Sequence, residues 1–219
     1  MRSATQSHLR FPLTRLLGNS GNIRVLRALL SYGGPLGVSQ LSRESGLTPQ
    51  GVRLVLENLE NQRVLVALGE PRARLYDINP RYPFASVLRQ LVAEETLRWE
   101  QVLQALRNAV REHNTLSAAW YYGSAARGED DAASDLDLAI VVRGEDVEQT
   151  LASIRHALQP AEETLLFTCS VVGLSESDVA RLSRDNDAWW TGLVRDAKVL
   201  IGTGPEQLGV RARRQPEAA

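Results

Sequence analysis

The stretch GSAARGEDDAASDLDL, residues 123–138, decides the fold of the C-terminal half of this 219-residue chain. It opens with Gly-Ser, continues through ten small or polar residues, and ends with Asp135 and Asp137 at the start of the apolar run DLDLAIVV. Aspartate is a poor strand residue. Two aspartates one residue apart in an apolar strand therefore indicate a functional requirement.

The spacing of the two aspartates points to a divalent cation. Alternate residues of a strand face the same side, so Asp135 and Asp137 share one face while Leu136 and Leu138 enter the core. Adjacent carboxylates repel each other and resist joint ionisation. A divalent cation removes this repulsion, and Mg²⁺ binds one or two carboxylates together with the phosphate oxygens of a substrate.

The Gly-Ser pair supplies the second half of such a site. Gly123 permits a close approach of the backbone, and Ser124 stands where a helix can begin with its N–H groups free to meet a phosphate. Arg127, one turn later, would add a charge-assisted contact. The sequence therefore predicts a phosphate site beside a cation site.

This pattern resembles the signature of the nucleotidyltransferase superfamily, with its polymerase-β-like fold, in the minimal form of that family. The resemblance implies Mg²⁺- or Mn²⁺-dependent transfer of a nucleoside monophosphate from an NTP, with ATP expected, to a hydroxyl. Asp135 and Asp137 would be the catalytic, metal-binding pair. Gly123, Ser124 and Arg127 would hold the nucleotide.

One departure from the family leaves the activity open. The family usually carries a third carboxylate on a later strand, predicted here at 164–173, and the corresponding position is Ser170. Without that acid the attacking hydroxyl lacks an obvious base. The domain is then an active enzyme, a nucleotide sensor, or a platform for protein contacts.

The N-terminal part is predicted to be a separate domain, residues 18–80. Apolar spacing predicts helices near 22–34, 37–46 and 48–61, followed by a hairpin of strands 64–68 and 73–78. The stretch VSQLSRESGLTPQGVRLVLENLENQRVLVAL, residues 38–68, resembles the winged helix-turn-helix domains of the MarR and ArsR types.

That resemblance implies binding to double-stranded DNA. Helix 48–61 would enter the major groove, and the two arginines of the hairpin turn would hold phosphates or the minor groove. Residues 1–80 carry more arginine than acid, and the rest of the chain the reverse. A winged helix used only for protein contacts is the alternative. The expected DNA contacts are Thr48, Gln50, Arg53, Arg72 and Arg74.

Residues 81–115 are predicted to form one long connector helix. Its apolar residues recur at alternating spacings of three and four, from Ala85 to Val110. This stripe either packs against the chain's own domains or pairs with a second copy. Because winged-helix proteins usually read two half-sites, the second alternative, a homodimer, is favoured.

The predicted architecture is α+β with two domains. A nucleotidyltransferase-like mixed sheet with helices occupies 116–204, and 205–219 is predicted to be a disordered tail. No apolar run is long enough to cross a membrane, residues 1–17 lack the apolar block of a signal peptide, and Cys169 has no partner for a disulfide. A cytoplasmic location is expected.

Two functions follow from these domains. The first is a DNA-binding transcriptional regulator whose nucleotidyltransferase-like domain binds Mg-NTP. The alternative is an active transferase that modifies a partner protein, as the antitoxins among the minimal family members do, or else a non-catalytic protein-contact domain.

Overall fold

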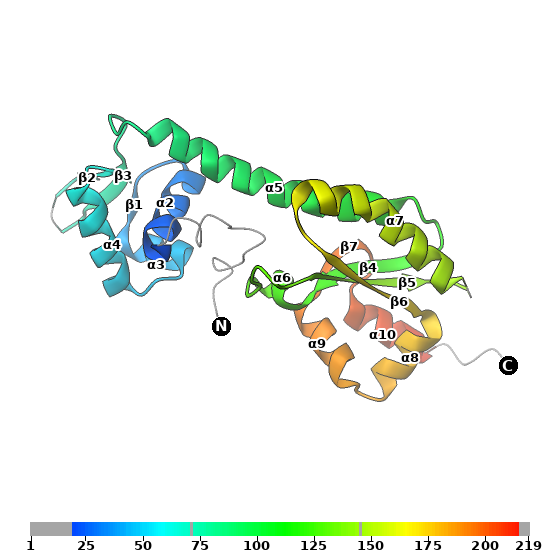
Figure 1. Cartoon of the computed structure of the whole chain (residues 1–219). Coiled ribbons are helices and arrows are strands. Elements are labelled where there is room, and N and C mark those ends of the chain that lie inside the picture. Colours follow the sequence, from blue (N-terminus) through cyan, green and yellow to red (C-terminus); the bar gives the residue numbers. More distant parts are fainter. Residues whose placement is uncertain (1–18, 71, 145, 215–219) are drawn as a thin grey trace. The chain divides into compact units, whose positions relative to one another are not determined.

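The computed structural model describes residues 19–70, 72–144 and 146–214 (Figure 1). Two compact units divide the chain, Met1–Trp99 and Glu100–Ala219. The predictions made for residues 1–17 and for the last five residues lie outside the described ranges.

The first unit begins with three helices. They are α2 (Ser20–Tyr32), α3 (Val38–Ser45) and α4 (Pro49–Asn61). Asn19 caps α2, because its side chain accepts the backbone N–H groups of Gly21 and Asn22. The three helices cover the ranges in which the sequence predicted helices.

Helix α4 begins where its sequence predicts. The Thr48 hydroxyl accepts the N–H of Gly51 at 3.1 Å, and Pro49 occupies the first helical position, where no N–H is needed. Val52 and Leu56 are buried on its inner face. The helix is therefore held by a cap at one end and by the core along its length.

A small antiparallel sheet completes the first unit. Strands β1 (Leu36–Gly37), β2 (Leu65–Leu68) and β3 (Leu75–Ile78) pair in the order β1-β3-β2. Strands β2 and β3 form the predicted hairpin. Before β2, Arg63 has a φ of 58°, the left-handed conformation that usually favours glycine.

Helix α5 (Ala85–Arg111) is the predicted connector. Ala85 and Val92 are buried in the first unit, and Leu106 and Val110 are buried beyond the boundary at Trp99. Most of the apolar stripe is therefore covered by the chain itself. This agrees with the first alternative for the stripe.

A buried ion pair fixes the start of α5 to α2. The guanidinium of Arg27 donates to both carboxylate oxygens of Glu95, at 2.6 and 3.0 Å. Both side chains are almost completely buried. Such a two-point contact sets the rotation of α5 in the first unit.

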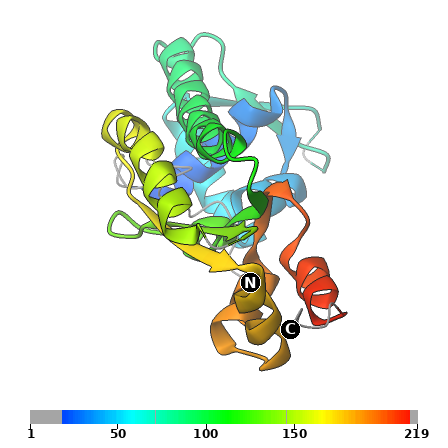
Figure 2. The ribbon, with the colours of Figure 1, turned by 90° about the vertical axis from the view of Figure 1, so that its right-hand side faces the viewer.

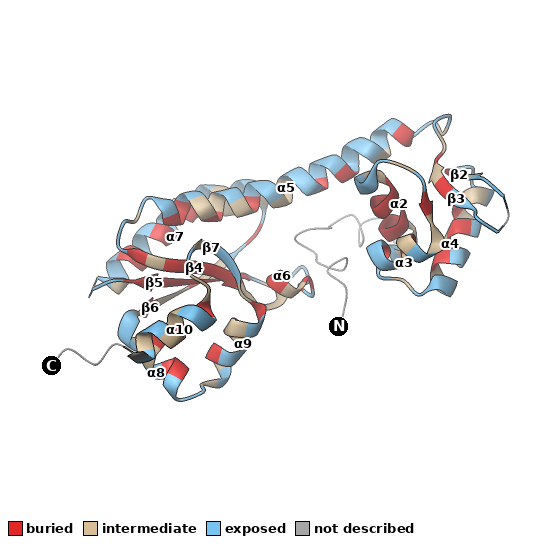
Figure 3. Ribbon diagram, turned by 180° about the vertical axis from the view of Figure 1, so that it is seen from behind, coloured by how far each residue is buried: buried red, intermediate tan, exposed pale blue. Residues whose placement is uncertain are grey.

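The second unit is built on a mixed sheet, as predicted. Its strands are β4 (Leu116–Tyr122), β5 (Leu136–Val142), β6 (Cys169–Ser175) and β7 (Lys198–Gly202), in the order β6-β5-β4-β7. Strands β5 and β6 are parallel, and the other pairs are antiparallel. Buried residues are concentrated along β4 and β5 (Figure 3).

Helices cover both faces of this sheet. Helix α7 lies on one face, while α8, α9 and α10 lie on the other (Figures 1 and 2). The short α6 follows β4 directly. The bounds are α6 Gly123–Arg127, α7 Val147–Leu165, α8 Glu176–Arg184, α9 Ala188–Asp196 and α10 Pro205–Arg214.

The prediction of a disordered tail from residue 205 is wrong for the described part of that segment. Residues 205–214 form α10, whose Leu208 and Ala212 pack against the core of the second unit. A Cβ added at Gly209 would lie 2.6 Å from the Ser183 hydroxyl oxygen and 3.2 Å from Trp190. Close packing therefore orders a segment whose polar composition suggested disorder.

The predicted strand 164–173 also begins later than expected. Helix α7 continues through Pro160 to Leu165 and ends at Leu166, whose φ is 53°. Strand β6 starts only at Cys169. The apolar residues before it therefore belong to the end of α7 and the connection.

Within the described ranges, no helix combines the length and the apolar character that crossing a membrane would require.

Candidate functional site

Residues from three strands meet at one end of the second unit's sheet. Tyr122 pairs with Asp137, and Asp137 pairs with Ser170 on the parallel neighbour. Directly opposed residues project to the same face of a sheet. The ends of β4 and the starts of β5 and β6 therefore form one surface, on the face that α8, α9 and α10 cover.

The Gly-Ser bend lies against the second aspartate. Gly123 has a φ of 71°. A Cβ added there would overlap the Oδ2 atom of Asp137 and lie 3.3 Å from its Cγ. Only glycine leaves room for this carboxylate. The next residue, Ser124, is half-buried in the first turn of α6.

The two aspartates influence each other. Asp135 is exposed just before β5, and Asp137 is half-buried within it. Burial and then the negative charge of Asp135 raise the pKa of Asp137, while the nearby Arg127 opposes this shift. Leu136 and Leu138, between and beyond them, are fully buried. Two carboxylates therefore influence each other here, an arrangement that a cation would stabilise.

The position expected for a third carboxylate holds a serine. Ser170 is the register partner of Asp137, so an acid there would face the same site. The nearby Glu162 of α7 is already engaged, because its Oε1 accepts the backbone N–H of Cys169 at 2.6 Å. In the ranges the structure covers, no three His, Cys, Asp or Glu side chains form a group that could hold a metal.

Arg127 is oriented differently from its expected role. Its Nε donates to Glu129 at 2.9 Å, and its Nη1 donates to Asp196 at 2.6 Å. These bonds raise the pKa of Arg127. The guanidinium therefore ties α6 to α9. Sequence reasoning missed this because Asp196 lies far along the chain at the end of α9.

Two aromatic side chains stand beside the acids. The rings of Tyr122 and Trp189 meet edge to face, with centroids 5.7 Å apart. Burial raises the pKa of Tyr122, and the charge of Asp137 adds to the shift. Trp189 comes from the first turn of α9. Alternate residues of β4 face opposite sides of the sheet, so Tyr122 lies on the same face as Asp137. This alternation could have identified Tyr122 from the sequence.

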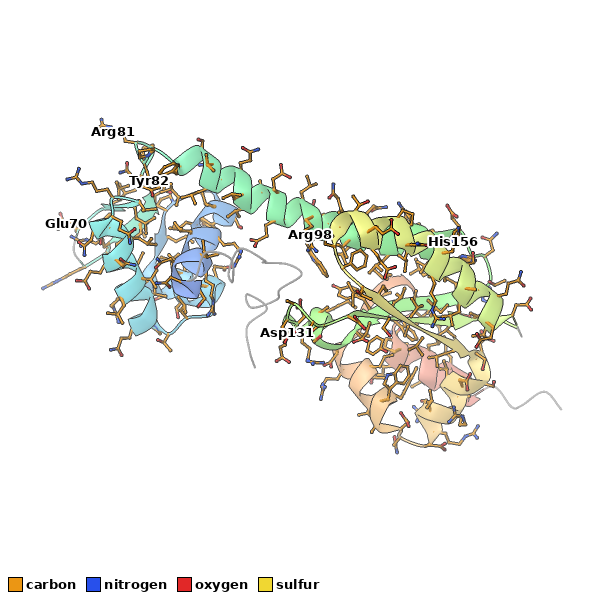
Figure 4. All side chains as sticks on the ribbon, in the orientation of Figure 1. Glu70, Arg81, Tyr82, Arg98, Asp131 and His156 are labelled. Carbon is orange, nitrogen blue, oxygen red and sulfur yellow. The ribbon has the colours of Figure 1, made fainter. Side chains whose placement is uncertain are left out.

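The loop between α6 and β5 is held by its own side chains. The Asp131 carboxylate accepts the N–H of Ala133 at 2.9 Å and the hydroxyl of Ser134 at 3.2 Å. Asp131 is exposed and lies beyond α6 (Figure 4). His156, which carries no partner motif in the sequence, is exposed on α7 (Figure 4).

The first unit carries a separate basic surface. Arg53 on α4 and the hairpin residues Arg72 and Arg74 line one hollow of about 760 Å³, together with Arg43 of α3. None of its described lining residues is acidic. We call this hollow, with its four arginines Arg43, Arg53, Arg72 and Arg74, the arginine hollow.

The other residues expected to contact DNA lie outside the lining of that hollow. The hydroxyl of Thr48 already caps α4, and Gln50 is exposed in the first turn of the same helix. Sequence reasoning missed Arg43, although its place in the last turn of α3 was available as a signal.

Residues 104–185 match the family model described as "Polymerase beta, Nucleotidyltransferase". This range is less than half of the chain, and it includes the Gly-Ser bend and both aspartates. None of the curated proteins compared with the chain matches it.

A similar solved structure is described as "Crystal structure of the toxin-antitoxin with AMP-PNP". It is 16% identical, covering 52% of this chain and 82% of that chain, with a TM-score of 0.36. The family match gives the second unit a nucleotidyltransferase-like fold.

Proposed function

We propose that the second unit binds Mg²⁺ and a nucleoside triphosphate at the edge formed by Gly123, Asp135 and Asp137, and transfers the nucleoside monophosphate to a hydroxyl. The observation that carries this proposal is the contact between the Asp137 carboxylate and the Gly123 bend. A carboxylate directly beside backbone that has no side chain supports a cation and a phosphate binding next to each other here.

The donor set fits a magnesium ion. Asp135 and Asp137 offer carboxylate oxygens, the ligands that Mg²⁺ and Mn²⁺ prefer. Burial and the charge of Asp135 raise the pKa of Asp137, so a bound cation would stabilise its ionised form. When bound, the ion would neutralise charge on the phosphates during transfer.

The chain's own residues position the substrate. Gly123 leaves its backbone open to the phosphates, and Ser124 offers a hydroxyl donor. In the transfer, a bond forms between the acceptor oxygen and the α-phosphorus. The bond from that phosphorus to the bridging oxygen breaks, and pyrophosphate leaves. Since Ser170 supplies no carboxylate, the acceptor proton passes to water or to a group of the acceptor.

We propose a partner protein as the acceptor, with ATP as the nucleotide. The support is the resemblance of the motif to the minimal transferases, some of which act as antitoxins on partner proteins.

Labelled nucleotides test the transfer. Purified protein is incubated with each labelled NTP, Mg²⁺ or Mn²⁺, and cell extract. We expect label on a protein band with the wild type and with Glu148→Ala, an exposed acid of α7 that serves as the control. No label is expected with Asp135→Ala/Asp137→Ala. Label that persists in the double variant would refute the assignment of the pair.

Thermal unfolding tests the binding step alone. Mg-ATP at one hundred times its dissociation constant stabilises a protein by about 2.7 kcal/mol. The wild type should therefore melt at a higher temperature with Mg-ATP, and the double variant should not. Equal shifts of the melting temperature for both proteins would refute the assignment of the metal site to Asp135 and Asp137.

The arginine hollow supports a second candidate function for the first unit. We propose that this unit is a winged helix-turn-helix that binds double-stranded DNA as part of a transcriptional regulator. The regulator would act as a homodimer that contacts two half-sites of the DNA. Arg43, Arg53, Arg72 and Arg74 gather there without an acid among the described lining residues. Such a surface suits phosphates.

Salt dependence tests this candidate. Arg53→Ala and Arg74→Ala should each weaken binding to duplex DNA, and the loss of a phosphate contact lowers the salt slope by about 1. Arg81→Ala, an exposed position outside the lining (Figure 4), is the control. If the wild type does not bind duplex DNA at low salt, the proposal that the chain is a DNA-binding regulator is refuted.

A further inference from the structure

A cavity lies at the end of the second unit's sheet that is opposite to the two aspartates. It holds about 260 Å³. Ser117 at the start of β4, Arg143 after β5 and Thr203 after β7 line it, as do Glu176 of α8 and Arg211 of α10. Strand β4 rises about 3.3 Å per residue, so its length separates this cavity from the Gly-Ser bend by roughly 20 Å.

Hydrogen bonds fix the polar wall of this cavity. The Nε of Arg143 donates to the Ser117 hydroxyl at 3.2 Å, and that hydroxyl donates to Glu176 at 2.9 Å. The Nη1 of Arg211 donates to the Thr203 hydroxyl at 3.4 Å, a long bond. No ion pair to a described carboxylate involves either arginine.

The remaining wall is apolar. Val141 and Val179 are fully buried beneath the cavity, and Leu208 of α10 closes one side. The close packing at Gly209 fixes α10 one residue further along. The cavity therefore combines an apolar floor with a few fixed polar groups, which is the composition of small-molecule sites.

We propose that this cavity binds a small carboxylic acid with a compact apolar body. Arg143 and Arg211 would hold the carboxylate, since guanidinium groups bind this anion at two points. Glu176 leaves the lining with one excess positive charge, which suits a monoanion better than a phosphate dianion. Val141, Val179 and Leu208 would cover the apolar body.

Nuclear magnetic resonance of the full chain tests the site. The indole N–H of Trp120 donates to the Thr203 backbone oxygen at 2.8 Å, so its resonance reports on the cavity wall. We expect benzoate to shift this resonance in a saturable manner. Benzamide, of the same shape but uncharged, should shift it little. No saturable shift with benzoate, or an equal response to benzamide, would overturn the proposal.

Variants locate the binding. Arg211→Gln and Arg143→Gln should each weaken benzoate binding about tenfold, the value of one charge-assisted hydrogen bond. Arg213→Gln, exposed on the same helix and outside the lining, should bind as the wild type does. Equal affinity in all three variants would show that benzoate binds elsewhere. The amide spectrum of each variant verifies its fold.

This inference is independent of the proposed nucleotide site. Asp135→Ala/Asp137→Ala should retain the benzoate response of Trp120, because both aspartates lie at the other end of the sheet. Loss of that response in the double variant would contradict a separate site.

Discussion

Replacement of Gly123 by alanine tests the contact on which the proposed function depends. The variant has two costs. A left-handed φ costs a non-glycine residue about 1–2 kcal/mol, and Gly123 has a φ of 71°. The new Cβ would also overlap Oδ2 of Asp137, and such overpacking costs about 1–3 kcal/mol.

A matched glycine separates these costs. Gly144 has a φ of 86°, and a Cβ added there meets nothing within 4 Å. Gly144→Ala should therefore lower the free energy of unfolding by the backbone cost alone, about 1–2 kcal/mol. Gly123→Ala should lower it by about 2–5 kcal/mol.

A double-mutant cycle isolates the contact with Asp137. In an Asp137→Ala background, the new Cβ at residue 123 would lie 3.7 Å from the Cβ at residue 137, an ordinary contact. The cost of Gly123→Ala should then fall to that of Gly144→Ala. We expect a coupling of about 1–3 kcal/mol between the two positions.

Urea unfolding measures the cycle. The fluorescence of Trp120 and Trp190, both buried in the second unit, follows the transition. If Gly123→Ala costs the same in both backgrounds, to within about 0.3 kcal/mol, then Asp137 does not lie against the bend. The proposed nucleotide site would lose its basis.

Three further predictions concern single positions. Ser170→Asp adds a carboxylate to the face of the acid pair and should raise the rate of label transfer about 100-fold, the contribution of a general base; an unchanged rate would contradict this. Glu95→Ala removes the carboxylate that the buried Arg27 guanidinium binds and should lower the free energy of unfolding by about 3–5 kcal/mol, whereas the adjacent, exposed Glu94→Ala should not. Ser175→Ala removes the cap of α8 and should cost about 1 kcal/mol at pH 7. Hydrogen bonds from Ser175 lower the pKa of Asp178, so its contribution to stability is lost as the pH falls through that lowered pKa, and the cost of Ser175→Ala in urea unfolding should shrink on acidification.

Much of the local structure was predictable because the chain encodes it at short range. Thr48 and Pro49 mark the start of α4, and Ser175 marks the start of α8. The apolar run DLDLAIVV predicted β5. The register that sets Ser170 opposite Asp137 agrees with the position inferred from the family's strand.

The errors arose where distant packing decides the structure. Helix α10 is mostly polar, and only contacts such as that of Gly209 with Trp190 order it. The ion pair of Arg127 with Asp196 could not be read from the sequence either, because Asp196 lies far along the chain. The apolar stripe of α5 was predicted correctly, but the residues that cover most of it belong to the same chain. A spacing pattern identifies a buried face without identifying what covers it.

Helix α5 has a consequence for dividing the chain. The boundary between the two units falls inside this continuous helix, between Trp99 and Glu100. A fragment cut there would end or begin with a short length of helix, and short isolated helices are marginal in water. A fragment that keeps either unit intact should therefore retain the whole of α5.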